Sequence, residues 1–338
     1  MKNKATIYLG SLLAAVIVIG ACSLPEMSGT WTTASSEGFG NRCWATACPV
    51  DGKIYVIGGY GDSLLATTLD VYNPSTNKWS QLNTKGTFTQ RASLASCNLN
   101  GKIYVFGGAT GPEQPSAMSN ALEVFDPATN TWSTPKTKGS LAPRNNLCAC
   151  VVRGKIYTLG GYTAESPGDV NTLEMFDPAT NTWSVPETKG SFTPHGAFTA
   201  NVVNNKIYAI GGYNDKGTKG HRVLSTVEVF DPATNTWSAP ATTGTFRARL
   251  LHTSGVVDGK IYVIGGTPDV RNPLTTDLVQ VFDPATNAWS TPATTGTFTP
   301  RAYLSGAVVN NKIYVIGGQD TSQVFNKIEV LTPSRKNG

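Results

Sequence analysis

A sixfold internal repeat constrains the fold of this 338-residue chain more than any other feature. Six apolar segments end in a Gly-Gly pair, and successive pairs are 49, 53, 51, 54 and 52 residues apart. A period near 50 residues is typical of arrays, because one such unit cannot bury its apolar face without neighbours. The chain is therefore predicted to consist of six similar units. The pairs are Gly58-Gly59, Gly107-Gly108, Gly160-Gly161, Gly211-Gly212, Gly265-Gly266 and Gly317-Gly318.

Each unit is predicted to form four short antiparallel strands, so the chain is expected to be all-β. A strand rich in β-branched and aromatic residues, such as residues 53–57, precedes each Gly-Gly pair. Before it stands a two-residue turn that suits the positive φ of a type I′ hairpin. After the pair come a loop of variable length, a strand such as residues 122–125, an Asp-Pro turn and a Trp. The hairpin turns are Asp51-Gly52, Asn100-Gly101, Arg153-Gly154, Asn204-Asn205, Asp258-Gly259 and Asn310-Asn311.

The Gly-Gly pair, the Asp-Pro turn and the Trp at this period resemble the kelch repeat over about residues 29–333. The resemblance implies a six-bladed β-propeller with four antiparallel strands per blade. The last unit ends without its own Trp, and Trp31 supplies the sixth. An N-terminal strand around Trp31 is therefore expected to close the ring and to remove an unpaired sheet edge. The other five are Trp79, Trp132, Trp183, Trp237 and Trp289.

The N-terminal residues are typical of an export signal. A cationic start precedes an apolar stretch that is too short to span a bilayer comfortably, and Gly20-Ala21-Cys22 follows it. This ending resembles the lipobox of bacterial lipoproteins, which implies that Cys22 is lipidated. An ordinary secretory signal is the alternative. We expect a lipoprotein signal peptide at 1–21, a lipidated linker at 22–28, the propeller at 29–333 and a tail at 334–338.

The predicted anchor implies an exported protein on the outer membrane or on the outer face of the plasma membrane. Only 14% of the residues are charged, and no run of Lys and Arg interleaves with aromatic residues, which excludes nucleic acid as a partner. The chain has no nucleophile elbow, phosphate-binding loop or metal motif, so neither a cofactor nor a metal is expected. We expect a monomer that contacts the membrane only through its anchor.

Each predicted inner strand begins with a basic residue at one register. The resemblance implies that arginines here contact acidic groups of bound peptides, and Arg binds carboxylates bidentately. This set is therefore the first candidate site for a protein, peptide or glycan ligand, with an anionic ligand favoured. The set is Arg42, Arg91, Arg144, His195, Arg249 and Arg301.

An acidic residue at a second register offers a structural alternative for the same set, because buried charges are tolerated mainly when paired. The second register holds Asp70, Glu123, Glu174, Glu228, Gln280 and Glu329. Two repeats depart from the pattern: Gln280 leaves Arg249 without an acid, and His195 replaces Arg. We hypothesise that Arg249 and His195, on adjacent blades, bias the mouth of the central channel towards an anionic ligand.

Five cysteines remain after Cys22, and their disulfide state is left open by the sequence. Three of them share one register, where other repeats have small residues, which favours close packing near the axis. They are Cys48, Cys97 and Cys150, and the other two are Cys43 and Cys148.

The long loop of the fourth repeat, residues 213–222, is the one segment with a resemblance to an enzyme. It is similar to a loop of the six-bladed bacterial sialic acid mutarotases (N-acetylneuraminate epimerases). That resemblance implies that Arg222 holds the sugar carboxylate and that Asp215 moves a proton. A solvated loop is the alternative. The sequence favours a binding or scaffolding module, with a carbohydrate-directed isomerase as the alternative function.

Overall fold

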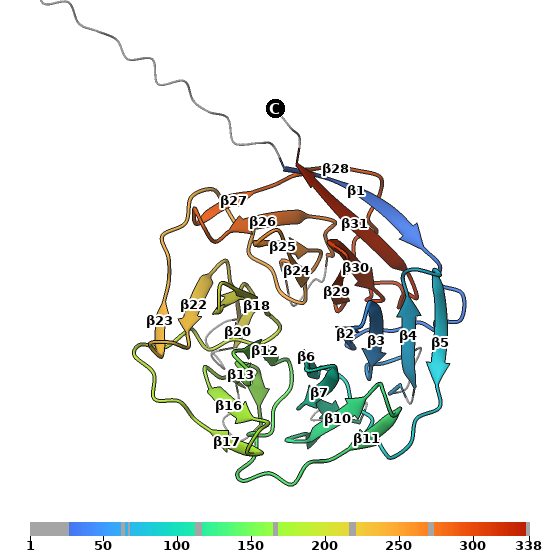
Figure 1. Cartoon of the computed structure of the whole chain (residues 1–338). Helices are drawn as coiled ribbons and strands as arrows, with labels where there is room; N and C mark the ends of the chain where they lie inside the picture. The colour runs from blue at the N-terminus through green and yellow to red at the C-terminus, as the bar shows by residue number, and fades with distance from the viewer. Residues whose placement is uncertain are drawn as a thin grey trace, which may run out of the picture.

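The computed structural model describes residues 27–61, 65–66, 68–111, 117–164, 168–215, 221–269 and 274–335. Six mainly antiparallel sheets of at least four strands surround a central axis (Figure 1). Helices do not occur in these residues, and so none of them forms a helix long and apolar enough to cross a membrane. The predicted all-β, six-bladed propeller is confirmed. The predicted signal peptide and most of the predicted linker, Cys22 included, lie outside the described residues.

Blades 1 to 5 each place four consecutive main strands in order from the axis to the rim. Blade 1 contains β2 (Thr46–Val50), β3 (Lys53–Ile57), β4 (Leu69–Asn73) and β5 (Lys78–Leu82). Blade 2 contains β6 (Ala95–Leu99), β7 (Lys102–Phe106), β10 (Leu122–Asp126) and β11 (Thr131–Ser133). Blade 3 contains β12 (Cys148–Val152), β13 (Lys155–Leu159), β16 (Leu173–Asp177) and β17 (Thr182–Ser184).

The next two blades follow the same order. Blade 4 contains β18 (Thr199–Val203), β19 (Lys206–Ile210), β22 (Val227–Asp231) and β23 (Thr236–Ser238). Blade 5 contains β24 (Thr253–Val257), β25 (Lys260–Ile264), β26 (Val279–Asp283) and β27 (Ala288–Ser290). The variable loops of blades 2 to 4 form small hairpins of their own: β8 (Ala109–Thr110) with β9 (Ala117–Met118), β14 (Tyr162–Thr163) with β15 (Gly168–Asp169), and β20 (Tyr213–Asp215) with β21 (His221–Val223).

Blade 6 joins the two ends of the chain. Its sheet has the order β29 (Ser305–Val309), β30 (Lys312–Ile316), β31 (Ile328–Arg335), β1 (Met27–Ala34) and β28 (Ala293–Thr295). Trp31 lies opposite Leu331 in the antiparallel pair of β1 and β31, as the closure prediction requires. Both strands extend two residues beyond the predicted limits of 29 and 333, because their pairing continues to Met27 and Arg335.

The hairpin turns between the first two strands of each blade have positive φ at both central residues, which is the type I′ geometry. Even Arg153, the unusual member of this set, has φ 49°. The Gly-Gly pairs also have positive φ, and there glycine is required for a second reason. A Cβ atom on Gly59 would lie 2.4 Å from the carbonyl oxygen of Cys43. We call the end of the blades with these hairpin turns the hairpin face, and the opposite end with the variable loops the loop face.

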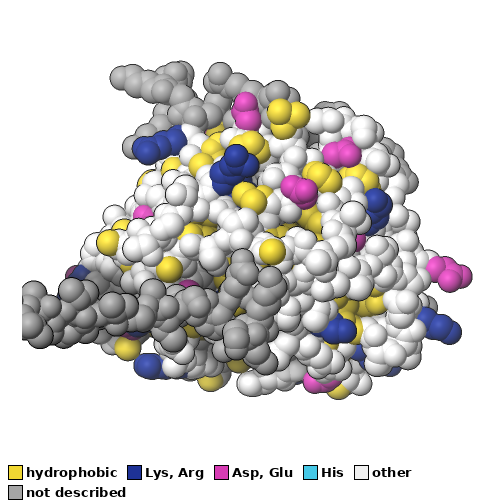
Figure 2. Space-filling view, turned by 90° about the horizontal axis from the view of Figure 1, so that it is seen from above, with side chains coloured by type: hydrophobic (Ala, Val, Ile, Leu, Met, Phe, Trp, Pro, Cys, Tyr) yellow, Lys and Arg dark blue, Asp and Glu magenta, His cyan; other side chains and the backbone are white. Residues whose placement is uncertain are grey.

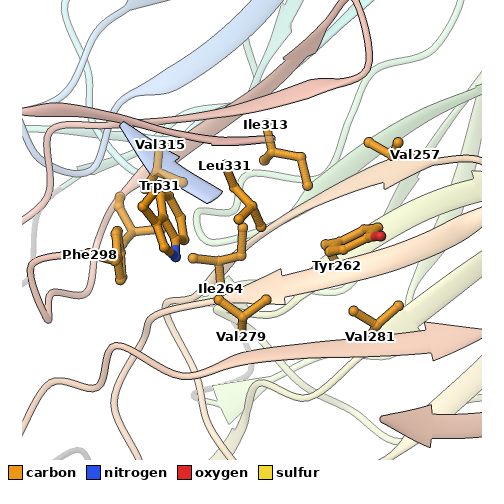
Figure 3. Close-up of a cluster of buried hydrophobic side chains, with 11 residues drawn as sticks. Trp31, Val257, Tyr262, Ile264, Val279, Val281, Phe298, Ile313, Val315 and Leu331 are labelled. Carbon is orange, nitrogen blue, oxygen red and sulfur yellow. The ribbon is translucent and has the colours of Figure 1, made fainter. Parts of the chain in front are cut away.

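The apolar core lies between adjacent blades, in six clusters. One cluster joins blade 5 side chains such as Ile264 and Val279 to blade 6 side chains such as Leu331 (Figure 3). Trp31 is 5% exposed in this cluster and stacks on Phe298 with ring centroids 4.7 Å apart. The N-terminal strand therefore supplies core side chains as well as hydrogen bonds to the last blade.

Deletion of residues 29–33 is expected to lower the free energy of unfolding by more than about 3 kcal/mol, because loss of a buried Trp alone costs about that much. The deletion also leaves the edge of β31 unpaired. Urea unfolding followed by tryptophan fluorescence measures the change. The exposed substitution Thr32→Ala is the control and should be nearly neutral. Cooperative unfolding of the deletion variant at an unchanged midpoint would refute the role of this strand in closure.

Candidate functional site

The six basic residues of the predicted ligand set lie on the loop-face side, four residues before the first residue of each inner strand and not at the start of the strand as the sequence predicted. Their side chains are buried. Arg42 is 6% exposed and the other five residues are at most 1% exposed. Residues this deeply buried do not line an open channel mouth. Ligand contact by the six residues therefore stays a prediction that the geometry does not favour.

Four of the arginines form buried ion pairs with the acids of the second register, which confirms the structural alternative. Arg42 lies 2.7 Å from Asp70, and Arg144 lies 2.5 Å from Glu174. Arg91–Glu123 and Arg301–Glu329 are the other two pairs. Burial lowers the pKa of Arg91, Arg144 and Arg301, and each paired glutamate opposes that shift. The acids thus stabilise cations that burial alone would penalise.

The arginines also support the Gly-Gly corner of their own blade. Arg91 Nε donates a hydrogen bond of 2.6 Å to the carbonyl oxygen of Gly107, and Arg301 Nε does the same to Gly317. The backbone carbonyl of Arg91 in turn accepts a hydrogen bond of 3.0 Å from Gly59 N of the preceding blade. One arginine therefore stabilises the Gly-Gly pair of its own blade through its side chain and the junction with the preceding blade through its backbone carbonyl.

An apolar residue three positions before each basic residue also belongs to this arrangement, and the sequence analysis missed it. Phe88 lies between the ring of Trp132, 4.8 Å away between centroids, and the guanidinium of Arg91, 4.8 Å from the Phe88 centroid. The recurrence of Phe at this register was a signal available in the sequence. The six residues are Phe39, Phe88, Leu141, Phe192, Phe246 and Phe298.

Blade 4 replaces the buried cation by His195. Its Nδ1 lies 3.9 Å from a Glu228 carboxylate oxygen, and neither ring nitrogen has a hydrogen-bond partner among the described residues. The ring packs against Phe192 and Phe198, with centroids 5.3 and 4.1 Å away. Burial lowers the pKa of His195 to about 3 and raises that of Glu228. At neutral pH His195 is uncharged, so it adds no positive charge to the loop face.

Blade 5 has the opposite departure from the pattern, a buried cation without a carboxylate. Arg249 Nη1 donates a 2.6 Å hydrogen bond to Gln280 Oε1, and Nη2 donates to the carbonyl oxygen of Val263 at 3.0 Å. Burial, with a smaller contribution from Arg247, lowers the pKa of Arg249 to about 9. The amide of Gln280 satisfies the guanidinium geometrically but leaves its charge uncompensated.

A second ring, two residues after each basic residue, surrounds the axis on the loop-face side. At each position the backbone N–H donates to the carbonyl oxygen of the same position in the preceding blade, over 2.8–3.2 Å. Trp44 N closes the circle on Tyr303 O at 3.0 Å. All six residues have positive φ between 52° and 58°. This mouth ring consists of Trp44, Ser93, Asn146, Ala197, Leu251 and Tyr303.

The mouth ring contains no glycine, although 24 glycines elsewhere adopt positive φ. A bulky residue such as Trp, Leu or Tyr is an outlier in this region, at a cost of roughly 1 kcal/mol or more per residue. Strain of this kind concentrates where side chains are needed for function. The sequence analysis missed the ring because its residue types differ from blade to blade.

The mouth ring lines a cavity of about 110 Å³, together with the residues that follow it, such as Leu94 and His252. The Trp44 and Tyr303 rings lie 4.3 Å apart at the edge of this cavity. Burial lowers the pKa of His252 to about 3 and raises that of Tyr303, so both are neutral at pH 7. No other lining residue of this cavity is ionisable. The mouth therefore offers aromatic, aliphatic, hydroxyl and amide groups without charge.

The two candidate catalytic residues lie on the small hairpin of blade 4. Asp215 pairs with His221 and Arg222 pairs with Asn214, so the two candidates occupy neighbouring rungs. Side chains of neighbouring rungs point to opposite faces of a ribbon. Asp215 N donates to Asp169 Oδ2 at 2.6 Å, and burial raises the pKa of Asp169 to about 7. The structure does not bring Asp215 and Arg222 onto one face, and their catalytic role stays a prediction.

The five cysteines that the structure describes are free thiols. Burial raises the pKa of Cys48 and Cys150 to about 12, and that of Cys97 well above its usual value. These three thiols are buried, as the prediction of close packing requires. The described residues contain no group of three or more His, Cys, Asp or Glu side chains that could hold a metal ion.

Comparison with known proteins gives one family throughout. The chain matches the family model of the KLHDC2/KLHL20/DRC7 Kelch-repeats domain in two overlapping stretches, residues 44–266 and 197–337. Kelch domain-containing protein 3 of Homo sapiens is 26% identical over 311 residues, which cover 86% of this chain and 81% of that protein. The Rab9 effector protein with kelch motifs of Homo sapiens is 29% identical over 172 residues, which cover 49% of this chain and 44% of that protein.

The substitution Gln280→Glu is expected to stabilise the propeller at pH 7, because it gives Arg249 a carboxylate partner like those of the other four buried arginines. A hydrogen bond to a buried charged partner is worth about 2 kcal/mol, from which the lost amide bond to Thr245 O subtracts. Urea unfolding measures the gain. Gln81→Glu, on the exposed part of β5, is the control. A destabilised Gln280→Glu variant beside a neutral control would contradict this account of Arg249.

Stability is expected to fall as the pH drops from about 6.5 towards 4.5, with buried His195 and His252 as two of the causes. Their folded pKa values are about 3, whereas an unfolded histidine binds its proton near pH 6.5. The unfolded state therefore takes up these protons first, at about 1.4 kcal/mol per pH unit for each histidine. Urea unfolding between pH 7.5 and 4.5 should show a shallower pH dependence in His195→Gln and in His252→Gln than in the wild type. Parallel curves would contradict the buried neutral state.

Proposed function

Because this chain belongs to the Kelch-repeat family, we propose that it is an exported, lipid-anchored propeller that binds a protein through its loop face at the cell envelope. One similar protein is named as an effector of Rab9, which supports a protein partner in general for this chain. Acylation at Cys22 would hold the propeller to the outer membrane or to the outer face of the plasma membrane. The propeller acts as a monomer.

The mouth ring is the observation that carries this proposal. Five bulky or polar side chains and one alanine occupy backbone positions where glycine would be less strained, and the ring hydrogen bonds hold them around the axis. The ring bonds use backbone atoms only, so the identity of the side chains is free to serve recognition. The four arginines at the neighbouring register serve the scaffold instead.

The order of residues around the mouth indicates the chemistry of the partner. Leu251, Tyr303 and Trp44 come from consecutive blades and form an aromatic and aliphatic half. Ser93, Asn146 and Ala197 form a small and polar half. Tyr and Trp are enriched at the energetic centres of protein interfaces. The uncharged mouth favours a neutral, apolar side chain of the partner over the anionic group that the sequence led us to expect.

Site-specific photo-crosslinking in the source cells tests the loop face. Benzoylphenylalanine in place of Leu251 is expected to yield one discrete adduct whose partner is identified by mass spectrometry. The same label in place of Val185, an exposed apolar residue on the rim of blade 3, is the matched control and should not yield that adduct. Equal adducts from both positions would contradict binding at the mouth.

The substitution Trp44→Gly then measures the contribution of the mouth to affinity for the identified partner. Glycine accepts the positive φ, so the variant should fold, with a melting temperature close to that of the wild type. Loss of a central Trp should weaken binding at least 10-fold by titration calorimetry. Unchanged affinity would overturn the proposal. Binding of this protein to a glycan on a glycan array, with no protein partner found, would also overturn it. Cys22→Ala is the anchoring control and should move the protein from the membrane fraction to the soluble extract.

A further inference from the structure

The described chain begins and ends on the hairpin side of blade 6. Strand β31 starts at Ile328, paired with Ile316 at the loop-face end of β30, and runs towards the hairpin face. Its last rung with β30 is Leu331, so β31 continues past the start of β30 to Arg335, where Met27 pairs with it. In Figure 1 the start of β1 and the end of β31 lie together at one edge of the ring.

The chain between the predicted acyl group and this edge is short. Residues 23–26 separate Cys22 from Met27, which makes five Cα-to-Cα steps and a reach of no more than roughly 18 Å when extended. An acyl group in the bilayer therefore keeps the hairpin side of blade 6 near the headgroups.

The hairpin face carries one lysine per blade at a fixed register, the first residue of the second strand. In blades 2 to 5 an aspartate at the end of the third strand neutralises it, as in Lys102–Asp126 at 3.0 Å and Lys206–Asp231 at 3.2 Å. Lys155–Asp177 and Lys260–Asp283 are the other pairs. Four of the six lysines at this register are thus compensated.

Blade 6, where both described ends of the chain lie, and its neighbour blade 1 break this pattern. Asn73 stands at the aspartate position opposite Lys53 in blade 1, and Thr332 stands opposite Lys312 in blade 6. Both lysines are exposed, and neither has a carboxylate partner among the described residues. Lys78 adds a third exposed cation beside Asn73. Asp51 lies in the adjoining hairpin turn. In blades 1 and 6 it is the one acidic residue among the hairpin turns and the positions that hold Lys and Asp in the other blades.

We infer that the hairpin face of blades 6 and 1 lies against an anionic lipid headgroup surface, so that the mouth ring points away from the membrane. This inference rests on the proposed lipid anchor, and it replaces the expectation from the sequence that the anchor is the sole membrane contact. Lysines within a Debye length of anionic headgroups are attracted to them. The uncompensated lysines lie on blade 6, where the tether leaves, and on blade 1, which is one of its two neighbours, whereas blade 5, the other neighbour, keeps its Lys260–Asp283 pair. Figure 2 shows Lys, Arg, Asp and Glu side chains scattered over a mainly uncharged surface.

Lysine acetylation of the full lipidated protein tests the orientation. The protein is reconstituted into vesicles of phosphatidylcholine and phosphatidylglycerol at 3:1, into phosphatidylcholine vesicles, and into detergent micelles. A membrane-impermeant acetylating reagent and peptide mass spectrometry then give a rate for each lysine. On anionic vesicles the rates at Lys53 and Lys312 are expected to fall at least threefold relative to detergent. Lys327, exposed on the loop face, should keep its rate.

Matched variants separate charge from proximity. In Lys53→Gln/Lys312→Gln the protection of Lys78 on anionic vesicles should weaken, whereas Lys206→Gln, at the same register in blade 4, should leave it unchanged. Protection of equal size on phosphatidylcholine vesicles would overturn recognition of anionic headgroups. Protection of Lys327 in place of Lys53, or equal rates everywhere on bound vesicles, would overturn the orientation. Absence of an acyl mass on Cys22 together with no vesicle association would instead refute the proposed anchor.

Discussion

The hydrogen bond between the second glycine of one blade and the backbone carbonyl of the basic residue in the next holds the ring together. It occurs at all six junctions, including Gly318 N to Arg42 O at 2.7 Å, where the last blade meets the first. A side chain on this glycine would collide with the neighbouring backbone. The position of this carbonyl group must also be fixed within its own blade. The buried side chain of the same arginine, which is hydrogen-bonded within that blade, fixes it. The Gly-Gly pair, the arginine and its acid are thus parts of one junction.

Two junctions show what happens when that set is incomplete. Blade 4 keeps the acid and loses the cation, so His195 is neutral and Glu228 carries a raised pKa. Blade 5 keeps the cation and loses the acid, so Arg249 relies on the amide oxygen of Gln280. Both blades nevertheless form the same backbone hydrogen bonds as the others. The backbone geometry is therefore robust, while the side-chain electrostatics are where individual blades differ in stability.

Much of this architecture is predictable from sequence because the constraints repeat six times. The period, the type I′ turns and the missing sixth Trp predict the blades and their closure without any long-range information. Burial of the arginines was not fixed in the same way. The side chain of a basic residue next to an inner strand can point towards the axis or towards an acid on the third strand. The sequence position of the residue is the same in both cases. The choice depends on packing against Phe88 and its equivalents, which only the folded blade shows.

The mouth ring could not be predicted from the sequence for a different reason. Its common property is a backbone conformation, and its residues range from Ala197 to Trp44. Pattern reasoning looks for shared residue types, whereas here the types differ while the conformation is constant. That difference is informative. Positions whose side chains the junctions between blades require, such as the glycines and arginines, are nearly uniform, whereas positions without this requirement vary. In the mouth ring the backbone forms hydrogen bonds between blades, while the side chains are not constrained by them. The side chains that contact a partner can therefore change without any change in the junctions that close the propeller.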